Sequence, residues 1–382
     1  MTTDTQFLSN IKPQLQNLWE KSGFESPTAI QSEAIPFILQ RKDLVAESPT
    51  GTGKTVAYLI PILNQIQEES KSLQAVILAP SRELVMQIYQ EVQKWTEGTA
   101  IVGASLVGGA NIKRQLDKLK ERPQIVVGTP GRILELIKLR KLKMHEVQTI
   151  VLDEGDQLLV KEHLETVRTI VKSTMNDRQL LLFSATAVKD IDQVIAMIGR
   201  MPEKIKISRN KDTVSATVDH CYLLCEPRDK AKLLQKIAAM DGVKALVFVR
   251  SVGSMTVLAE KLKYEGVSLE MLHSEMRKSE REKSLSALRD SNVKVLLATD
   301  VAARGLDIEG LTHVIHYDFP EDTEQYIHRS GRTGRMGATG TVVSLISERE
   351  ERELKKIGRE LKLNILPRRI FKGQLVEVNR KK

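Results

Sequence analysis

The sequence contains little cysteine, since only Cys221 and Cys225 occur among its 382 residues. They lie in "HCYLLCE", where strand alternation would place both on one face but too far apart along it for easy bridging. A redox or metal-binding pair is the alternative interpretation. We expect reduced thiols with a structural role, which is the usual state in a reducing compartment.

Long apolar runs are also absent, because no stretch reaches the roughly 18 apolar residues that a membrane-spanning helix requires. The first residues, "MTTDTQFLSN", lack the basic and apolar regions of a secretory signal peptide. Low-complexity tracts and short-period repeats are missing as well. These absences predict a cytoplasmic protein with no membrane partner.

Negative charge is in deficit, with 58 Lys and Arg against 49 Asp and Glu and a formal net charge of +9. Such a surplus favours a polyanionic partner, although a basic solvated surface explains it equally well. Near the end of the chain, "NILPRRIFKGQLVEVNRKK" carries six Lys or Arg and one Glu. This segment is either a nucleic-acid arm or a solubilising tail.

The sequence does contain a regular alternation of short apolar runs with segments of helical period. The runs include "QAVILAP", "TIVLDE", "ALVFVRS" and "KVLLATD", a pattern typical of parallel sheets covered by helices on both faces. Single domains usually have about 100 to 200 residues, so we predict an α/β fold with two domains. We expect them at 1–208 and 220–365, with a polar linker at 209–219 and a basic tail at 366–382.

A glycine-rich segment, "SPTGTGKT" at 48–55, follows the strand-like "DLVAE". Glycines there allow backbone amides to approach phosphate oxygens, Lys54 can neutralise the β and γ phosphates, and the Thr55 hydroxyl can bind magnesium. The common spacing of such loops has glycine where Ser48 stands. A plain glycine-rich turn therefore remains the alternative.

Three carboxylates follow a second apolar run in "VLDEGDQL" at 151–158. Asp153 is suited to hold the magnesium ion, directly or through water, and Glu154 to polarise the attacking water. An acidic helix cap is the alternative, and the phosphate loop upstream makes it the weaker one.

The second half of the chain lacks a glycine-lysine loop but contains "HRSGRTGR" at 328–335. Arginines on this turn could stabilise charge at a γ-phosphate if the two domains close. A surface cluster of basic residues explains the same string equally well.

Ten motifs follow one another in an order typical of one family: "GFESPTAIQ", "SPTGTGKT", "PSREL", "GG", "TPGR", "DEGD", "SAT", "VFVRS", "ATDVAARGLDI" and "HRSGRTGR". The chain thus resembles the DEAD-box ATP-dependent RNA helicases of the short bacterial kind, over about residues 7–347. The resemblance implies two tandem RecA-like domains, each a mostly parallel sheet covered by helices, with an ATP cleft between them. It also implies the cofactors ATP and Mg²⁺, and RNA-stimulated ATP hydrolysis coupled to domain closure and local duplex unwinding or RNA–protein remodelling.

For the nucleotide, the resemblance implies that Gln31 reads the adenine edge, that Phe24 packs on its ring and that Phe7 caps it from upstream. The rest of the implied nucleotide site is the phosphate loop with Asp307 from the second domain: Ser48, Pro49, Thr50, Gly51, Thr52, Gly53, Lys54, Thr55 and Asp307. Thr55 and Asp153 are the implied metal ligands.

For catalysis and coupling, the resemblance implies that Arg332 and Arg335 are arginine fingers and that His328 links them to "DEGD". Ser184 and Thr186 are expected to couple hydrolysis to closure through Asp156. The implied RNA-binding residues are Arg82, Gly109, Thr129, Arg132, Arg281 and Thr299. These residue types suit contacts to the phosphate backbone with weak sequence preference, although strand-end capping is the alternative for either threonine. Ribosomal or other RNA–protein partners and a monomeric state are expected too, with ribosome assembly or RNA metabolism as the setting.

The sequence departs from the family pattern at several positions: Ser81, Gly155, Arg250, Ser274, Lys278 and Ser330. At Gly155 relatives usually carry alanine, and the loss of a methyl group costs roughly 0.5 to 1 kcal/mol in a helical turn. That is small beside the loss of a catalytic carboxylate, so we expect "DEGD" to be a working ATPase motif. Two other functions compete with this hypothesis: an ATP-gated RNA clamp that hardly unwinds duplexes, and a DNA-translocating helicase.

Overall fold

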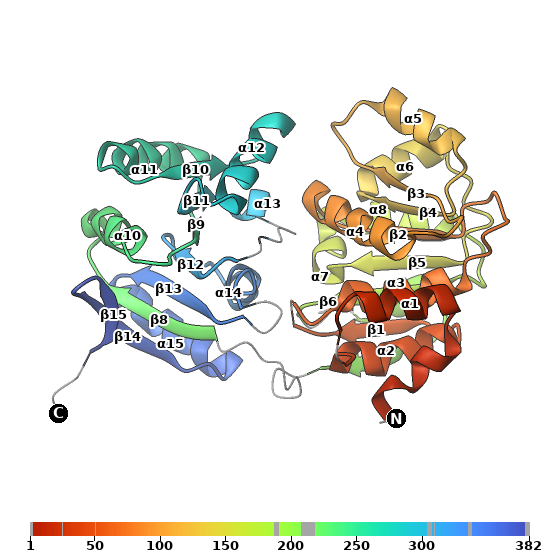
Figure 1. Ribbon diagram of the computed structural model, residues 1–382, viewed down its shortest axis with the longest axis horizontal. Helices are drawn as coiled ribbons and strands as arrows, with labels where there is room; N and C mark the ends of the chain where they lie inside the picture. Colours follow the sequence, from red (N-terminus) through yellow and green to blue (C-terminus); the bar gives the residue numbers. More distant parts are fainter. Residues whose placement is uncertain are drawn as a thin grey trace. The chain divides into compact units, whose positions relative to one another are not determined.

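The computed structural model describes residues 3–24, 26–49, 51–186, 191–207, 218–303, 308, 310–334 and 338–378. The chain divides into two compact units, Met1–Thr213 and Val214–Lys382, and each unit contains one β-sheet (Figure 1). Most of the linker expected at 209–219 lies outside the described residues, as does 379–382. Among the helices that the structure describes, none combines the length and the apolar character needed to cross a membrane.

The sheet of the first unit has seven strands in the order β3-β4-β2-β5-β6-β1-β7, and each of its strand pairs is parallel. The strands are β1 Leu44–Glu47, β2 Ala75–Leu78, β3 Gly103–Leu106, β4 Ile125–Gly128, β5 Thr149–Asp153, β6 Gln179–Ser184 and β7 Glu203–Lys206. Strands β2, β4, β5 and β6 are buried at every position. The continuous apolar runs therefore form strands covered on both faces, as predicted.

Helices cover both faces of this sheet, and neighbouring strand residues point to opposite cores. Ile77 packs in one core, with residues of α1 to α4, while Val76 packs in the other, with residues of α6 to α9. The helices are η1 Thr3–Asn10, α1 Pro13–Lys21, α2 Ala29–Leu39, α3 Lys54–Gln65, α4 Arg82–Trp95, α5 Ile112–Lys120, α6 Pro130–Lys138, α7 Gly155–Leu158, α8 Lys161–Lys172 and α9 Ile191–Ile198.

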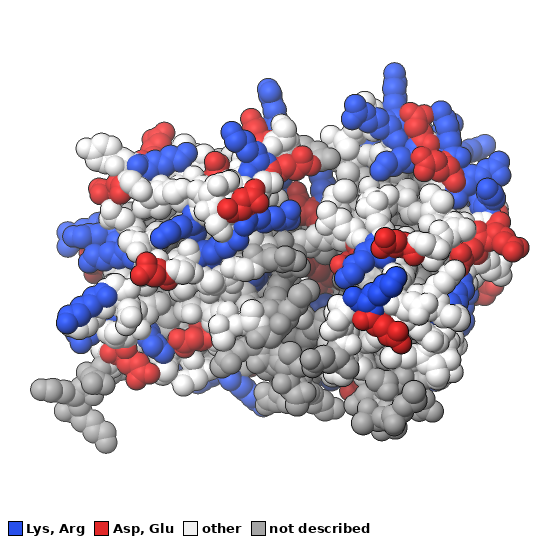
Figure 2. All heavy atoms as spheres, viewed as in Figure 1, with Lys and Arg blue, Asp and Glu red and all other residues white. Residues whose placement is uncertain are grey.

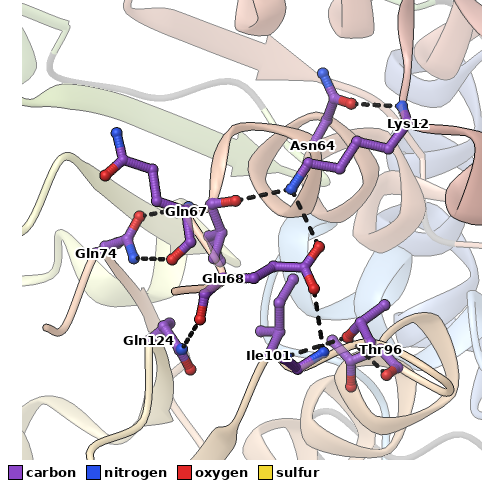
Figure 3. A network of polar contacts seen from close by, with 11 residues as sticks. Lys12, Asn64, Gln67, Glu68, Gln74, Thr96, Ile101 and Gln124 are labelled. Carbon is purple, nitrogen blue, oxygen red and sulfur yellow. Dashed lines mark hydrogen bonds and ion pairs between the residues drawn. The ribbon is translucent and has the colours of Figure 1, made fainter. Parts of the chain in front are cut away.

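A polar network joins the segments at the amino ends of these strands (Figure 3). The backbone amide of Lys12 donates to Asn64 Oδ1 at 2.7 Å, and its Nζ donates to the Ile66 carbonyl at 2.8 Å. Glu68 accepts from the Ala100 amide at 3.1 Å, and its own carbonyl accepts from Gln124 Nε2 at 3.0 Å. These contacts lie at the edge of the sheet where the strands begin. The loops that carry the motifs lie at the opposite edge, where the strands end.

The second unit has an eight-stranded sheet in the order β10-β11-β9-β12-β13-β8-β14-β15. All its pairs are parallel except β14 with β15. The strands are β8 Val218–Leu224, β9 Ala245–Phe248, β10 Leu269–Leu272, β11 Val295–Ala298, β12 His313–His316, β13 Gly340–Ile346, β14 Ile365–Phe371 and β15 Gln374–Glu377. The helices are η2 Pro227–Asp229, α10 Lys230–Ala238, α11 Val252–Tyr264, α12 Lys278–Arg289, α13 Asp300–Ala303, α14 Thr323–Ser330 and α15 Glu348–Leu361.

The segment expected as a basic tail is part of this sheet up to Glu377. Strand β14 pairs with β8 and forms a hairpin with β15, in which Phe371 lies opposite Gln374. The two residues of the turn, Lys372 and Gly373, have φ angles of 47° and 73°, as a tight hairpin turn requires. Ile370 packs partly buried against the core. Strand pairing and the packing of Ile370 and Leu375 against the core thus make an edge hairpin out of a segment that composition alone marks as a tail.

Both cysteines are free thiols. Cys221 is buried in β8, and burial raises its pKa to about 12. The burial of Cys221 agrees with a structural role, and the reduced state of the pair stays a prediction.

Candidate nucleotide and RNA site

The motif loops of the first unit leave one edge of its sheet. They follow the carboxyl ends of β1, β2, β3, β4, β5 and β6 in turn. In parallel α/β sheets, ligands bind at this edge because helix N-termini and loop amides gather there. The sequence motifs, far apart in the chain, are thereby brought together.

The phosphate loop connects β1 to the N-terminus of α3. Lys54, the first residue of α3, donates from Nζ to the carbonyl oxygens of Ser48 and Pro49 at 2.7 and 2.9 Å. The Ser48 and Thr52 hydroxyls lie 2.7 Å apart, and the Ser48 amide donates to the Ser184 carbonyl at 3.0 Å. The loop is thus tied both to itself and to the neighbouring strand. Thr50 lies outside the described residues.

Gln31 contacts the phosphate loop from α2. Its Oε1 accepts from the Thr28 amide at 2.9 Å, and its Nε2 donates to the Gly53 carbonyl at 3.3 Å. The Thr28 hydroxyl donates to the Thr52 carbonyl at 2.7 Å. Gln31 therefore lies beside the loop that its expected role in nucleotide binding requires.

The two expected adenine-packing phenylalanines lie in an aromatic cluster. Phe24 is 36% exposed, with its ring centroid 5.2 Å from Trp19 and 6.3 Å from Trp95. Phe7 is 5% exposed and packs edge-on against Trp19. Phe24 therefore offers a ring surface to a ligand, whereas Phe7 supports the cluster from within the core.

Asp153 ends β5 as a buried carboxylate. Its Oδ2 accepts from the Tyr58 hydroxyl at 2.8 Å, and its Oδ1 accepts from the Glu154 amide at 2.9 Å. Burial, with the nearby Glu154 charge, raises the pKa of Asp153 to about 6, although Lys54 acts in the opposite direction. Tyr58 lies on α3, one turn after Thr55, so the phosphate-loop helix and the acidic motif are joined directly.

Gly155 begins α7 directly beneath β6. A Cβ placed on it would lie 2.7 Å from both Cγ and Cδ2 of Leu182, and Leu182 is fully buried. Glu154, just before it, adopts φ 52° in the left-handed region. Backbone freedom is therefore not the whole reason for a glycine here, because Leu182 already fills the space of a methyl group.

The expected link between "DEGD" and "SAT" is present. The Thr186 hydroxyl donates to Asp156 Oδ2 at 2.7 Å, and the Ser184 hydroxyl donates to the Thr186 carbonyl at 2.6 Å. Ser184 therefore shapes the turn that presents Thr186. The ends of β5 and β6 are joined by side chains as well as by the sheet.

The RNA-binding residues expected in the first unit converge on the loop after β3. Gly109 has φ +68°, and a Cβ there would overlap the Arg82 guanidinium. The Thr129 hydroxyl accepts from the Gly108 amide at 3.3 Å and does not cap its own helix. Arg132 donates to the Ala110 carbonyl at 3.3 Å and is only 7% exposed. Arg132 thus holds the loop in place, while Arg82 lies on its surface.

Basic side chains gather over α5, which follows this loop (Figure 2). Exposed cations there are Lys113, Arg114, Lys118, Lys120 and Arg122. The positive charge of the chain is therefore concentrated locally, next to the expected RNA-binding loop.

In the second unit, Arg281 and Thr299 also lie close together. Arg281 donates to the His273 carbonyl at 2.9 Å and to the Ala302 carbonyl at 3.4 Å. The Thr299 carbonyl accepts from the amides of Ala302 and Ala303, so Thr299 lies where α13 begins. The side chain of Lys278 lies outside the described part.

Helix α14 carries His328 and leads to Arg332, whose Nε donates to the His328 carbonyl at 3.1 Å. The helix is held by Arg329, which donates to both carboxylate oxygens of Asp300 at 2.7 Å. Asp300 follows Thr299, so the expected RNA-binding segment and the expected finger segment are joined. Arg335 and Asp307 lie outside the described residues.

Sequence reasoning missed three residues of this site: Tyr58, Leu182 and Arg329. Arg329 stands inside "HRSGRTGR" and Asp300 inside "ATDVAARGLDI", so their opposite charges could have suggested a pair. Tyr58 and Leu182 carry no such signal, because their roles depend on which strands and helices are neighbours. Ser81, a departure from the family pattern, keeps a helix cap, since its hydroxyl accepts from the Leu84 amide at 3.1 Å.

Comparisons with known proteins agree with this arrangement. The sequence profile of the DEAD/DEAH box helicases matches residues 28–194, and that of the helicase conserved C-terminal domain matches residues 229–337. The probable ATP-dependent RNA helicase YfmL of Bacillus subtilis is 53% identical over 94% of this chain and 96% of its own length. The DEAD-box ATP-dependent RNA helicase CshC of Bacillus cereus is 49% identical over 98% of this chain and 96% of its own.

Solved structures give the same result for the fold. The structure of S. cerevisiae Dbp5 bound to RNA and ADP BeF3 is similar over 96% of both chains, with a TM-score of 0.85 and 30% sequence identity. The predicted fold class, two α/β units with mostly parallel sheets covered by helices, is confirmed.

Proposed function

The chain belongs to the DEAD-box family of ATP-dependent RNA helicases, and we propose that it hydrolyses ATP in response to RNA and uses each cycle to unwind short duplexes or to remodel RNA–protein complexes. One observation carries the proposal. The phosphate loop, the buried Asp153 and the Asp156–Thr186 hydrogen bond lie together on one edge of one parallel sheet. This arrangement supplies a phosphate cradle, a carboxylate for a metal and a link between motifs.

Nucleotide binding is assigned to the loop at 48–55 and to α2. Backbone amides at the N-terminus of α3 favour phosphate oxygens, and the Lys54 ammonium would leave the Ser48 and Pro49 carbonyls to neutralise them. Gln31 is proposed to contact adenine in addition to its hydrogen bond to the Gly53 carbonyl. Phe24 would pack on the adenine ring.

Magnesium fits the residues at the end of β5. Asp153 is 3% exposed, and its pKa of about 6 reflects the cost of keeping a buried carboxylate charged beside Glu154. A divalent cation relieves that cost, and carboxylate and hydroxyl oxygens are ligands that it prefers. Asp153 and Thr55 would hold the ion, which supplies charge neutralisation on the phosphates when bound. Glu154 is proposed to orient and polarise the attacking water.

RNA contacts are assigned to the exposed side of the motif loops. Arg82, the Gly109 backbone and Thr129 suit phosphate oxygens in the first unit, as Thr299 does in the second. Arg132 and Arg281 are proposed to position these loops, because both donate to backbone carbonyls. Readout through phosphates gives weak sequence preference.

Coupling and catalysis also need the second unit. Arg332 and Arg335 are proposed to stabilise the transition-state charge once RNA binding closes the two units, with His328 and Asp156 as intermediaries. The Asp156–Thr186 bond supports the part of this proposal that lies in the first unit.

We assign the protein to the cytoplasm as a monomer, with ribosomal or other RNA–protein complexes as partners. The two free thiols agree with a reducing compartment.

The experiment compares ATP hydrolysis with RNA, with single-stranded DNA and with no nucleic acid, and follows separation of a short RNA duplex in excess ATP. Hydrolysis stimulated by RNA with duplex separation is expected. Glu154→Gln, which keeps the side-chain shape, serves as the control and should lose nearly all turnover. Hydrolysis without separation would instead identify an ATP-gated clamp, and equal stimulation by DNA would contradict the assignment to RNA.

A further inference from the structure

A concave surface lies in the second unit between α15 and β14. It encloses about 410 Å³ above Tyr222, Leu354 and Ile365. Three basic residues line its side: Lys355 and Arg359 on α15, and Lys362 directly after the helix. We call this surface, with the adjoining outer face of the hairpin, the C-terminal groove.

The outer face of the hairpin continues the groove beyond α15. Ile365 lines the cavity, so Pro367, Arg369 and Phe371 point to the same side by strand alternation. Ile370 and Leu375 point the opposite way, into the core. The rise of a strand places Phe371 roughly 20 Å from Ile365, so the outer face of the hairpin extends well beyond the cavity.

An exposed aromatic ring ends the groove. Phe371 is 52% exposed, and the Arg369 guanidinium and Lys372 Nζ lie 5.5 and 5.6 Å from its ring centroid. An exposed phenylalanine on an edge strand is costly unless it has a partner. Proteins that bind single-stranded nucleic acids combine aromatic rings, on which bases stack, with cations that contact the phosphates.

The charge of the groove is positive and largely uncompensated. Within the described part of the chain, no ion pair involves Arg359, Lys362, Arg369 or Lys372. Lys355 is paired with Glu351 at 2.7 Å, and Glu351 also accepts from the Tyr222 hydroxyl. The acidic side chain at the groove is thus already bound, whereas four cations face a ligand.

We propose that the C-terminal groove binds a second segment of single-stranded RNA, apart from the RNA-binding loops. This deepens the proposed function and rests on RNA being the substrate. Strand β14 is five strands from β11 in the sheet, which at about 4.8 Å a step is roughly 24 Å from Thr299. RNA held there would be tethered, which raises the affinity for long strands without entering the catalytic step.

The test measures binding of a fluorescent oligouridylate of about 20 nucleotides to the full chain, without nucleotide, over a range of salt concentrations. Phe371→Ala should weaken binding roughly fivefold or more through lost stacking. Arg369→Gln with Lys372→Gln should reduce the slope of log K against log salt by roughly 1.4, or about 0.7 for each phosphate contact. The matched control, Lys261→Gln with Lys263→Gln on α11, removes the same charge from a helix that packs on the other face and should change neither.

Photocrosslinking of 4-thiouridine RNA to the wild-type chain gives an independent readout, with adducts expected within residues 362–377. The proposal is overturned if Phe371→Ala binds normally and no adduct forms there, or if the control lowers the slope equally. Binding of a fluorescent polyglutamate to the same variants is measured in parallel. If the variants lose polyglutamate binding and keep RNA binding, the groove is a surface for an acidic protein and the proposal is overturned. ATP hydrolysis at saturating RNA should stay near wild type, so a wild type without RNA-stimulated hydrolysis would refute the proposed function and not the groove.

Discussion

Gly155 illustrates how a single residue depends on its neighbours in space. In the chain it stands between two acidic motif residues, and in the fold it stands against Leu182 of β6. The fully buried Leu182 occupies the volume that an alanine methyl group at position 155 would need. The proposed catalytic and coupling carboxylates, Asp153, Glu154 and Asp156, lie on either side of Gly155.

Gly155→Ala should therefore lower the free energy of unfolding by about 1 to 3 kcal/mol through overpacking. RNA-stimulated turnover below the unfolding temperature should change less than tenfold, since Asp153, Glu154 and Asp156 remain. Leu182→Ala in the same chain should recover part of the lost stability, so that the two effects are not additive. Denaturant unfolding of the four proteins checks this, and strict additivity would contradict the contact.

Lys54→Ala should abolish ATP turnover, because the loop loses its only side-chain cation. The loss of two hydrogen bonds to Ser48 and Pro49 should also loosen the loop. Steady-state hydrolysis at saturating RNA is the measurement. Turnover near the wild-type rate would place the nucleotide site elsewhere.

Single elements owe their positions to buried polar contacts. In the second unit, the side chain of His316 on β12 is fully buried. Its ring lies edge-on to Tyr326 of α14 and to Phe248, and its Nδ1 is 3.1 Å from the Ser344 hydroxyl. Burial, with Arg329 and His220 nearby, lowers its pKa well below 6.5. The helix that carries His328 is packed on this neutral ring.

The free energy of unfolding of the second unit should consequently fall as the pH drops below 6.5. In this range His316 binds a proton in the unfolded chain but stays neutral in the folded chain, because its pKa is lowered by folding. The contribution is fully present above pH 6.5. His316→Gln should reduce the loss by up to about 2 kcal/mol at pH 5, from 1.36 kcal/mol per pH unit. Thermal unfolding of both proteins between pH 7 and pH 5 tests this, and identical slopes would refute it.

The hairpin β14–β15 behaves as part of the sheet, which changes the expected result of removing residues 366–382. That deletion should weaken RNA binding and flatten its salt dependence, as a basic segment would. It should also lower the free energy of unfolding by about 2 kcal/mol, because Ile370 and Leu375 leave the core. A chain that ends at residue 378 keeps the hairpin and is the control. Equal stability of all three chains would mean that the hairpin is not packed.

At the scale of the whole molecule, the proposed mechanism divides catalysis between the two units. The first carries the phosphate loop and the acidic motif, and the second carries His328 and the arginines. Each unit positions its own groups through contacts inside it, such as Tyr58 with Asp153 and Arg329 with Asp300. In the mechanism proposed above, RNA would raise the rate by bringing these two preorganised sets of groups together.

Arg332→Ala should leave ATP affinity largely intact and reduce RNA-stimulated turnover by about 10³-fold or more, the loss typical of a missing arginine finger. Its present bond is to the His328 carbonyl, so the fold of α14 should persist. Equilibrium binding of a fluorescent ATP analogue, together with steady-state hydrolysis, separates the two effects. Reduced affinity with normal turnover would exclude the finger role.

The sequence by itself determined the fold class and the family. Alternating apolar runs and helical segments require helix-covered parallel sheets, and ordered motifs such as "SPTGTGKT" and "DEGD" place chemistry at strand ends. Both signals are local in the chain, so they can be read from it directly. The link between Asp156 and Thr186 was expected on the same basis and is present.

Only the tertiary structure decided which side chains meet. Tyr58 on Asp153, Leu182 on Gly155 and the packing of Ile370 in the core depend on strand order and on which face a residue occupies. The composition of the last segment predicted a basic tail. A count of charged residues cannot show whether a segment pairs with a strand, so the hairpin was not predicted. Its place in the sheet follows from pairing with β8 and from the packing of Ile370 and Leu375 against the core, and these are properties of the folded chain alone.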